Sequence, residues 1–420
     1  MSREKITHSS NFDQRPLFFS FLNTAWKSTY FLGTRIRLDK DGMIRAARKI
    51  TGLNDLGHDF SDEPFERLIK SVNEEADLHP VGRFITRQRF ISLLSMRLRA
   101  EYFFKKYPHI LEQELYPAWI IIGLQRTGTT KVQRLLASDS DHRVVLSWEA
   151  INPVPLDLNE TEKDKRIRVA NLSVKAVKFM SPGFFAIHPI DIHQPEEDIL
   201  LLDVSFMSTT PEAMMQVPSY SGWLEKTDQS EAYAYAVKLL KLLQWQRPGK
   251  RWVLKTPHHL EFPDLIEKHF NEVHFLWPHR TIYESVPSFL SMLTYNQMMF
   301  SDHVDERRIA QHWVRKTGYM LDKALDYREK PGNDSKFIDI RYQDLIKDSI
   351  GELERIYQLN GGLTPHLISQ FEFHEKEHPH RKYGKHEYSL ADFGLTEQDI
   401  DKHTARYQDF MKEQDAKKKG

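Results

Sequence analysis

The segment Ala118-Trp-Ile-Ile-Ile-Gly-Leu-Gln-Arg-Thr-Gly-Thr-Thr130 contains the change of pattern from which the fold is deduced. Residues 118–122 form a short apolar run typical of a buried strand. A loop with two glycines follows at 123–130, and apolar residues at helical spacing begin at Val132. The segment therefore predicts a strand, a loop and a helix in direct succession.

This loop has the composition of an anion-binding site. Gly123 lets the chain turn tightly out of the strand, and Gly128 permits close approach of the backbone to a ligand. Successive backbone N–H groups and the start of the following helix favour a negative charge, to which Arg126 adds a fixed cation. The residues expected to hold the anion are Arg126, Thr127, Gly128, Thr129 and Thr130.

The same alternation of strand and helix continues along the chain. Further short apolar runs predict strands, and each is followed by a helical pattern: strands at 144–146, 252–254, 273–277 and 337–340, and helices at 161–180, 231–246, 259–270, 283–292 and 343–359. Such alternation predicts an α/β fold with a central parallel sheet and helices on both faces. Ligands of these sheets bind at the carboxyl ends of the strands. The loops after Ile122, Leu254, Trp277 and Ile340 should therefore converge.

The first part of the chain differs from the rest. Residues 1–115 show helical spacing throughout and no strand pattern, so we expect a mostly helical N-terminal region, 1–115, packed on an α/β domain, 116–420. The segment 17–32 is rich in aromatic residues. We expect it to pack on the fold, although a membrane or partner surface is the alternative.

A second candidate anion site follows the strand at 273–277. Arg280 stands at the end of that strand, and Ser288 follows about two helical turns later. An arginine and a hydroxyl that leave one strand end can hold a phosphate, although a structural ion pair of Arg280 is the alternative. Together with the first loop, the pair suggests a ligand with two separated phosphate groups.

These two sites resemble those of the sulfotransferases that use 3′-phosphoadenosine 5′-phosphosulfate. Arg126-Thr-Gly-Thr-Thr130 is similar to that family's 5′-phosphosulfate loop, and Arg280 with Ser288 to its 3′-phosphate site. The bacterial-type branch is the most similar, through stretches that begin at Trp148, Trp252, Arg341 and Asp392 and over residues 45–412 as a whole. The resemblance implies a P-loop-like fold and sulfuryl transfer to a hydroxyl, less readily an amine, of a small or lipid-like acceptor.

The resemblance also suggests residues for the chemistry. Lys255 would contact the sulfate and the bridging oxygen, and Glu149 would be the base that takes the acceptor's proton. Other branches of the family use a histidine shortly after the lysine that corresponds to Lys255. His258 stands at such a position here and competes for the role of base. His188, Glu196 and Glu197 remain further candidates for the base.

Two more residues are expected near the nucleotide. Tyr342 would pack on the adenine or bind a phosphate, although core packing is equally compatible with its position. Arg381 lies in a basic, glycine-containing loop suited to closing over the 3′-phosphate. The eukaryotic pattern Gly-x-x-Gly-x-x-Lys is absent from that loop, so a solvated loop is the alternative.

Other function classes stay open on the residues alone. A P-loop kinase or NTPase using ATP and Mg²⁺ would lack its lysine, because Thr129 stands where that family has it. His374-Glu-Lys-Glu-His378 matches a zinc-peptidase pattern, but Pro379 disfavours the helical conformation that His378 would need. A non-catalytic binding protein with a vestigial nucleotide site is the remaining alternative.

Composition excludes several classes. Lys plus Arg and Asp plus Glu both number 59, so we expect no generalised nucleic-acid surface. The chain has no Cys, which excludes disulfides and thiolate catalysis. We expect a cytoplasmic protein, with membrane association through residues 16–32 as the alternative. The first residues lack the apolar core of a signal peptide, and no apolar run is long enough for a transmembrane segment. An apolar acceptor pocket is expected among residues 180–225, with Phe184, Phe185, Met207, Met214 and Tyr220 as candidates for its lining.

Overall fold

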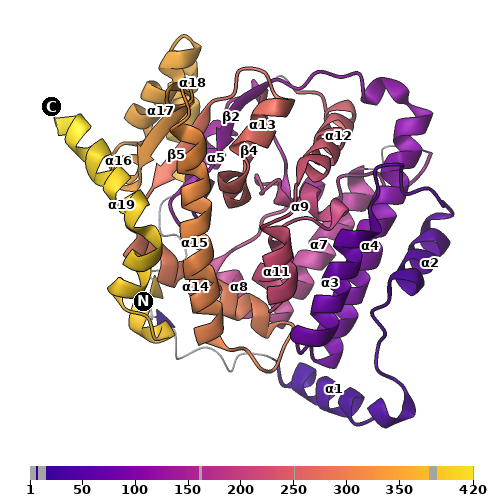
Figure 1. Ribbon diagram of the computed structural model, residues 1–420. Coiled ribbons are helices and arrows are strands. Elements are labelled where there is room, and N and C mark those ends of the chain that lie inside the picture. Colours follow the sequence, from indigo (N-terminus) through magenta and orange to yellow (C-terminus); the bar gives the residue numbers. More distant parts are fainter. Residues whose placement is uncertain (1–5, 8–15, 160–162, 250, 378–385, 420) are drawn as a thin grey trace.

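The computed structural model describes residues 6–7, 16–159, 163–249, 251–377 and 386–419. Its centre is a parallel sheet of five strands in the order β3-β4-β2-β5-β6 (Figure 1). The strands are β2 (Pro117–Ile121), β3 (His142–Val144), β4 (Arg251–Lys255), β5 (Phe275–His279) and β6 (Phe337–Arg341). The predicted parallel α/β sheet is thereby confirmed.

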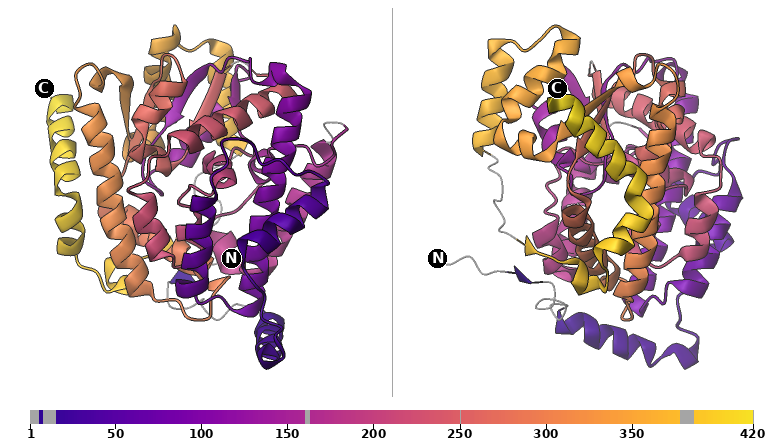
Figure 2. Two further views of the ribbon diagram at one scale, coloured as in Figure 1. Left: turned by 45° about the vertical axis from the view of Figure 1, so that its right-hand side comes forward. Right: turned by 60° about the vertical axis from the view of Figure 1, so that its left-hand side comes forward.

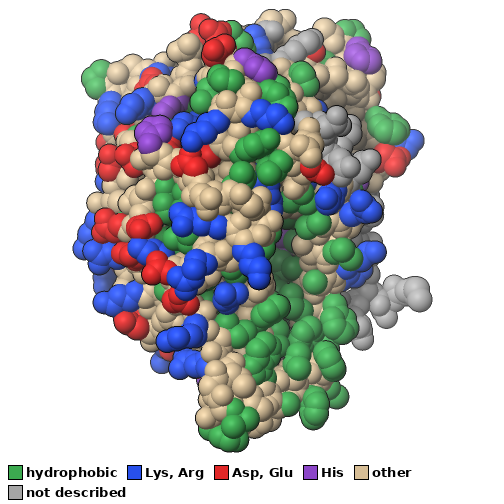
Figure 3. All heavy atoms as spheres, turned by 90° about the vertical axis from the view of Figure 1, so that its right-hand side faces the viewer, with side chains coloured by type: hydrophobic (Ala, Val, Ile, Leu, Met, Phe, Trp, Pro, Cys, Tyr) green, Lys and Arg blue, Asp and Glu red, His purple; other side chains and the backbone are tan. Residues whose placement is uncertain are grey.

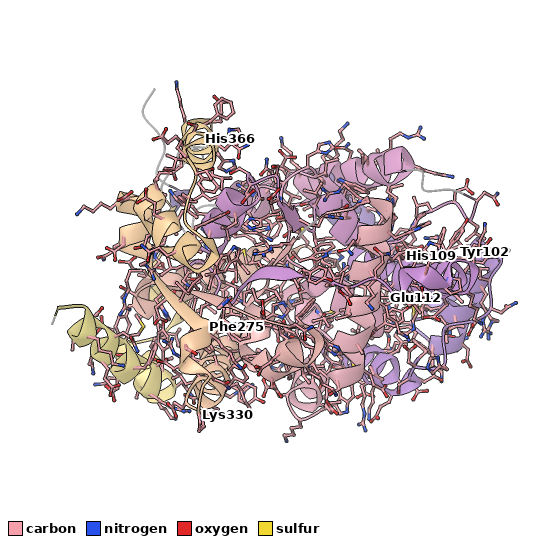
Figure 4. All side chains as sticks on the ribbon, turned by 90° about the horizontal axis from the view of Figure 1, so that it is seen from above. Tyr102, His109, Glu112, Phe275, Lys330 and His366 are labelled. Atoms are coloured by element: carbon pink, nitrogen blue, oxygen red, sulfur yellow. The ribbon has the colours of Figure 1, made fainter. Side chains whose placement is uncertain are left out.

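Helices cover both faces of this sheet, as predicted. Trp119 and Ile121 of β2 pack with α5, α16, α17 and α18, whereas Ile120 and the following Ile122 pack in the larger core on the opposite face. This alternation is the period of two that a strand imposes. Seen from above, Phe275 of β5 lies inside the molecule, with His366 of α18 and Lys330 beyond α15 on opposite sides of it (Figure 4).

The helices of the α/β part follow the predicted pattern with local differences. They are α5 (Thr129–Leu136), α6 (Ser147–Ile151), α7 (Lys163–Met180), α8 (Pro182–Ile187), α9 (Ile199–Leu202), α10 (Thr210–Met214), α11 (Pro218–Leu224), α12 (Ser230–Gln246), α13 (Pro263–His269), α14 (Ile282–Met298), α15 (Glu306–Arg328), α16 (Tyr342–Lys347), α17 (Ser349–Tyr357), α18 (Pro365–Glu377) and α19 (Glu397–Lys419). Short 3₁₀ turns join several of them, among them η4 (Asp203–Ser205) and η5 (Pro257–Glu261).

Two predicted helices are interrupted, each for a local reason. The pattern over 343–359 forms α16 and α17 because the Asp348 carboxylate accepts the Gly351 N–H and starts a second helix. The pattern over 259–270 is replaced by η5 and α13 because Pro263 fits only the first turn of a helix.

The N-terminal region is helical, as predicted, and packs on the α/β part. Its helices are α1 (Leu17–Lys27), α2 (Lys40–Thr51), α3 (Asp62–Glu75) and α4 (Pro80–Lys106) (Figure 1). Phe65 of α3 stacks on Phe206, with ring centroids 4.2 Å apart, and Phe90 of α4 meets the same ring edge-on. Burial of these aromatic rings joins the two parts in one hydrophobic core.

One expectation for this region is wrong, and a second holds only in part. A two-residue strand, β1 (Ile6–Thr7), pairs in parallel with β7 (His386–Glu387), although the sequence pattern predicts no strand before residue 115. The aromatic segment 17–32 does not pack wholly on the fold, because five of its large apolar side chains are exposed: Leu17, Phe18, Phe21, Phe31 and Leu32. None of the described helices combines the length and the apolar character needed to cross a bilayer.

Candidate active site

The sheet topology places the site. The chain leaves the central strand β2 toward β3 and β4 and later adds β5 and β6 on the other side. In parallel sheets this reversal opens a crevice at the carboxyl end of the central strand. The loop from Gly123 to Thr130 lies there and leads into α5. We call it the phosphate loop after its predicted role.

The loop has the backbone geometry that its glycines predict. Gly123 has φ +144°, and a Cβ there would lie 3.1 Å from the carbonyl oxygen of Pro278. Gly128 has φ +99° and precedes the first turn of α5, whose N–H groups have no partners within the helix. Thr127 and Thr129 are buried and Thr130 is exposed. Because the Thr127 hydroxyl donates to the Leu124 carbonyl at 2.7 Å, it holds the loop closed.

The structure brings the two candidate anion sites together. Arg126 Nε donates to Ser288 Oγ at 3.1 Å, although the residues are far apart in sequence. Arg280 Nη1 donates to the Arg126 carbonyl at 3.1 Å, and its guanidinium also pairs with Glu284 and lies 4.6 Å from the centre of the Tyr342 ring. Both predicted phosphate sites therefore belong to one cationic surface at the ends of β2 and β5.

A cleft adjoins this surface. It has a volume of about 570 Å³ and includes Arg280, Tyr283, the last residue of β6, Arg341, and the first residue of α16, Tyr342. Tyr342 also approaches the phosphate loop, since a Cβ on Gly128 would lie 3.0 Å from its ring. The cleft thus joins a stacking surface to the cations around Arg126.

Lys255 lies at the carboxyl end of β4, beside an acidic segment. Its buried Nζ lies 2.8 Å from Glu197 Oε1, and its N–H donates to Asp198 Oδ1 at 2.9 Å. Asp198 is itself fixed by His259, whose Nε2 lies 2.8 Å from the other carboxylate oxygen. The Glu197 side chain is 29% exposed, so this carboxylate, unlike Asp198, is open to an incoming molecule.

Hydrogen bonds from α5 and α6 hold the acidic segment Glu196–Asp198, and its charges act on His188. Gln133 of α5 donates to the Glu196 carbonyl at 3.0 Å, and Ser147 Oγ donates to the Glu196 carboxylate at 3.1 Å. Burial lowers the pKa of His188, while the charges of Glu196 and Glu197 act in the opposite direction. His188 is therefore a neutral imidazole on which the charges of Glu196 and Glu197 act.

Glu149 lies in a buried ion cluster. Arg143 donates to its two carboxylate oxygens at 2.8 and 2.9 Å, and Arg247 does so at 3.0 and 3.1 Å. The Leu146 N–H adds a fifth hydrogen bond. Burial alone would raise the pKa of Glu149, but Arg247 and Arg143 outweigh it and hold that pKa below its usual value. This carboxylate is saturated with donors and poorly suited to accept a proton.

His258 is also directed into the protein interior. Its Nε2 lies 3.0 Å from Gln229 Oε1, and its ring stacks with Tyr233. Burial lowers the pKa of His258 to about 3, so it stays neutral over the physiological range. A buried carboxamide therefore occupies the Nε2 position of this histidine.

The remaining predicted residues have varied outcomes. Arg381 lies outside the described residues. Tyr388, seven residues later in the sequence, is half-buried, and this burial raises its pKa to about 12 against the opposing charge of Arg126. Sequence reasoning missed Tyr388, because no motif marks a tyrosine beyond a basic loop. Of the apolar acceptor candidates, Met207 and Tyr220 belong to the main core and Phe184 to a small cluster beside α14. Among the described residues no group of three or more His, Asp or Glu could hold a metal ion.

Comparison with known proteins gives consistent similarities. A family model described as Sulfotransferase family matches residues 117–362. The omega-hydroxy-beta-dihydromenaquinone-9 sulfotransferases Stf3 of Mycobacterium bovis and Mycobacterium tuberculosis are each 25% identical over 260 residues, which cover 58% of this chain and 62% of theirs. The match therefore spans less than two thirds of these relatives.

Solved structures extend the similarity to most of the chain. Sulfotransferase STF1 of Mycobacterium tuberculosis H37Rv superposes with a TM-score of 0.76 at 27% identity, covering 88% of this chain and 98% of that one. Sulfotransferase STF9 of Mycobacterium avium gives a TM-score of 0.79 at 24% identity over 89% and 98%. The helical N-terminal part is thus included in the shared fold.

Proposed function

The chain belongs to the sulfotransferase family, and from that premise we propose that it moves a sulfuryl group from 3′-phosphoadenosine 5′-phosphosulfate to the hydroxyl of a lipid-like acceptor. The observation that carries the proposal is the meeting of Arg126, Ser288 and Arg280 beside the start of α5. A donor with a 5′-phosphosulfate and a 3′-phosphate needs two anion sites within one nucleotide's length.

The donor site is proposed from charge and hydrogen-bond capacity. The N–H groups at the start of α5 and the side chains of Arg126 and Thr130 would hold the 5′-phosphosulfate. Arg280 and Ser288 would hold the 3′-phosphate, and Tyr342 would lie against the adenine. Arg280 would leave Glu284 to bind the phosphate. The Glu284 carboxylate is exposed, so water can solvate it once the arginine has moved.

The chemistry is proposed for the end of β4. The bond from sulfur to the donor's phosphate oxygen breaks while sulfur bonds to the acceptor oxygen, and the acceptor's proton leaves. Lys255 would stabilise the charge that develops on the donor's phosphate oxygen. We assign the proton to Glu197, because it lies beside Lys255 and is partly exposed, whereas the oxygens of Glu149 are occupied by two arginines.

The acceptor class is proposed from the relatives. Stf3 is named for a hydroxylated menaquinone, which presents a hydroxyl on a long apolar molecule. Only part of that relative is matched, so the shared element that we propose is this chemistry and not the particular molecule. A primary alcohol on an isoprenoid or fatty chain is the first acceptor to test.

Binding of adenosine 3′,5′-bisphosphate tests the donor site. At 100 times its dissociation constant the ligand should stabilise the fold by about 2.7 kcal/mol. We expect a thermal shift with the bisphosphate that is lost in Arg280→Ala. Arg67→Ala is the matched control, because it removes a similar pair of residues four apart, Arg67 and Glu63, from another helix. A shift with ATP and Mg²⁺ but not with the bisphosphate would replace this proposal by the kinase.

Transfer from radiolabelled donor to a panel of fatty and isoprenoid alcohols tests the chemistry. Glu197→Gln should lower turnover about 10²-fold or more without changing bisphosphate affinity, as loss of a general base does. The control is the neighbouring variant Glu196→Gln, which should keep its turnover if Glu197 is the base. Full turnover in Glu197→Gln would move the role of base to His188.

A further inference from the structure

The helix α1 has two apolar faces, and only one of them is covered. Successive residues of a helix are rotated by about 100°, so Phe19, Asn23 and Trp26 share one side and Leu17, Phe18 and Phe21 the other. The first side is attached to the protein: Asn23 is buried and accepts the Val81 N–H at 3.0 Å, and Trp26 contacts Phe84. On the second side, Leu17 is 88% exposed and Phe21 is 72% exposed.

The exposed apolar surface continues onto neighbouring elements. Phe31 and Leu32, just after α1, are exposed. Phe19 of α1 lies against Phe179 of α7, with ring centroids 5.5 Å apart, and both Phe179 and Leu172 of α7 are exposed. We call the surface made by Leu17, Phe18, Phe21, Phe31, Leu32, Leu172 and Phe179 the apolar patch. It lies at the lower end of the molecule, where hydrophobic side chains border a hollow in the surface (Figure 3; Figure 2 shows how α1 protrudes there).

Positive charge accompanies this patch. The whole chain has no net charge, yet residues 16–38 contain three basic residues and 165–180 contain five, and neither segment contains an acidic residue. Among the exposed ones are Lys27, Arg35, Lys175 and Lys178. Apolar side chains that protrude between Lys and Arg are the features by which a helix lies on an anionic membrane.

Contacts along α7 and α8 lead from the patch to His188, beside the acidic residues of the candidate active site. The helix α8 follows α7 directly and ends at Ile187, so that His188 is the residue just after it. Lys178 of α7 lies over the Phe185 ring, and the Phe184 ring lies 5.8 Å from that of His188. His188 in turn shares the surroundings of Glu197 and Lys255. Aromatic side chains of α8 therefore lie between the end of α7 and His188.

We propose that the apolar patch docks this protein on the surface of a bilayer that contains anionic lipids. A second copy of the chain is disfavoured as the occupant, because a symmetric contact would bring the same basic residues together. Docking would bring α7 and α8, whose contacts lead toward His188, to the bilayer, where a lipid-like acceptor resides. Only this last step rests on the proposed function, and membrane binding itself does not.

Sedimentation with vesicles tests the proposal without donor or acceptor. The wild-type protein should bind vesicles of equal parts phosphatidylglycerol and phosphatidylcholine, and high salt should weaken the binding because it screens the attraction. The double variant Phe18→Ser/Phe21→Ser should reduce binding about tenfold or more, and Lys175→Glu/Lys178→Glu should abolish the preference for phosphatidylglycerol over pure phosphatidylcholine.

The matched control is Leu359→Ser/Phe373→Ser, which changes two equally exposed apolar residues far from α1. It should bind vesicles as the wild type does. Retained binding of the bisphosphate in every variant shows that the fold and the donor site are intact, so that loss of vesicle binding is a separate result. Equal vesicle binding by wild type and Phe18→Ser/Phe21→Ser, or none by the wild type, overturns the proposal. So does a concentration-dependent dimer that the same variant abolishes.

Discussion

Glu149 shows how one residue's surroundings decide its role. It follows a strand at a distance from the phosphate loop that suits a catalytic carboxylate, but the structure surrounds it with Arg143, Arg247 and the Leu146 N–H. A buried carboxylate with its hydrogen-bond capacity filled is an anchor for β3, α6 and the end of α12. Its importance should therefore appear in stability rather than in proton transfer.

We predict that Glu149→Gln lowers the free energy of unfolding by about 3 kcal/mol, because removing one partner of a buried ion pair leaves the other uncompensated. Urea denaturation measures this loss. Glu63→Gln, which breaks the exposed pair with Arg67, should have little effect. A stable Glu149→Gln protein with turnover about 10²-fold lower would instead return the base to Glu149.

Glu261 is a second buried carboxyl group, and its contribution to folding stability depends on pH. Burial raises its pKa to about 7, and Lys316, whose Nζ lies 3.8 Å away, is shared with Glu212 and Glu225. A carboxyl whose pKa is raised on folding stabilises the fold below its unfolded pKa, and that contribution is lost as the pH rises through the folded value.

We therefore predict that the wild type loses stability relative to Glu261→Gln between about pH 4.5 and pH 7, with a slope of up to about 1.4 kcal/mol per pH unit. Urea denaturation of both proteins across this range gives the difference and cancels the other titrating groups. Parallel curves would contradict the prediction, since the glutamine cannot titrate.

The phosphate loop is the element in which sequence and structure agree most closely. Its glycines, its arginine and its position between a strand and a helix can all be deduced from local pattern, because a chain reversal at a strand end requires particular residues. The contact of Arg126 with Ser288 could not be deduced in the same way. It depends on how β2 and β5 are paired, which no local pattern specifies.

Gly128→Ala should remove binding of the bisphosphate. The backbone strain at φ +99° costs about 1–3 kcal/mol, and the new Cβ would also lie 3.0 Å from the Tyr342 ring. Gly332→Ala is the control for backbone strain alone. Gly332 also has a positive φ, +84°, but a Cβ added there would meet no other atom within 4 Å. Calorimetric titration should give normal bisphosphate affinity for Gly332→Ala. Equal affinity in Gly128→Ala would show that the loop does not contact the ligand.

Strand order and side-chain direction mark the limit of what the sequence predicts. The apolar runs locate all five strands of the central sheet to within about two residues, since buried parallel strands are short apolar runs. The inward direction of His258 was not predictable, because it depends on Gln229 and Tyr233 from a separate segment. Glu197 is one of three acidic residues in a row, and only its partner Lys255 distinguishes it.

At the level of the complete chain, the N-terminal helices and the α/β part are joined by buried polar contacts as well as by apolar ones. Arg97 of α4 is almost fully buried and pairs with Asp59, and its Nε donates to the Leu56 carbonyl at 2.7 Å. Its guanidinium also lies 3.8 Å from the centre of the Tyr235 ring on α12. This side chain thus connects the N-terminal region with a helix that covers the sheet.

We predict that both regions unfold in one transition and that Arg97→Ala lowers the free energy of unfolding by about 3 kcal/mol, because it removes a buried side chain together with its hydrogen bond to Leu56 and its contact with the Tyr235 ring. Hydrogen exchange during urea denaturation should show amides of α4 and of the central sheet opening together. Asp59→Asn provides a milder variant in case Arg97→Ala does not fold. Lys105→Ala, which removes an exposed pair with Asp55 in the same region, should leave stability nearly unchanged. Separate transitions, with α4 opening first and the sheet intact, would mean that the N-terminal region folds independently of the α/β part.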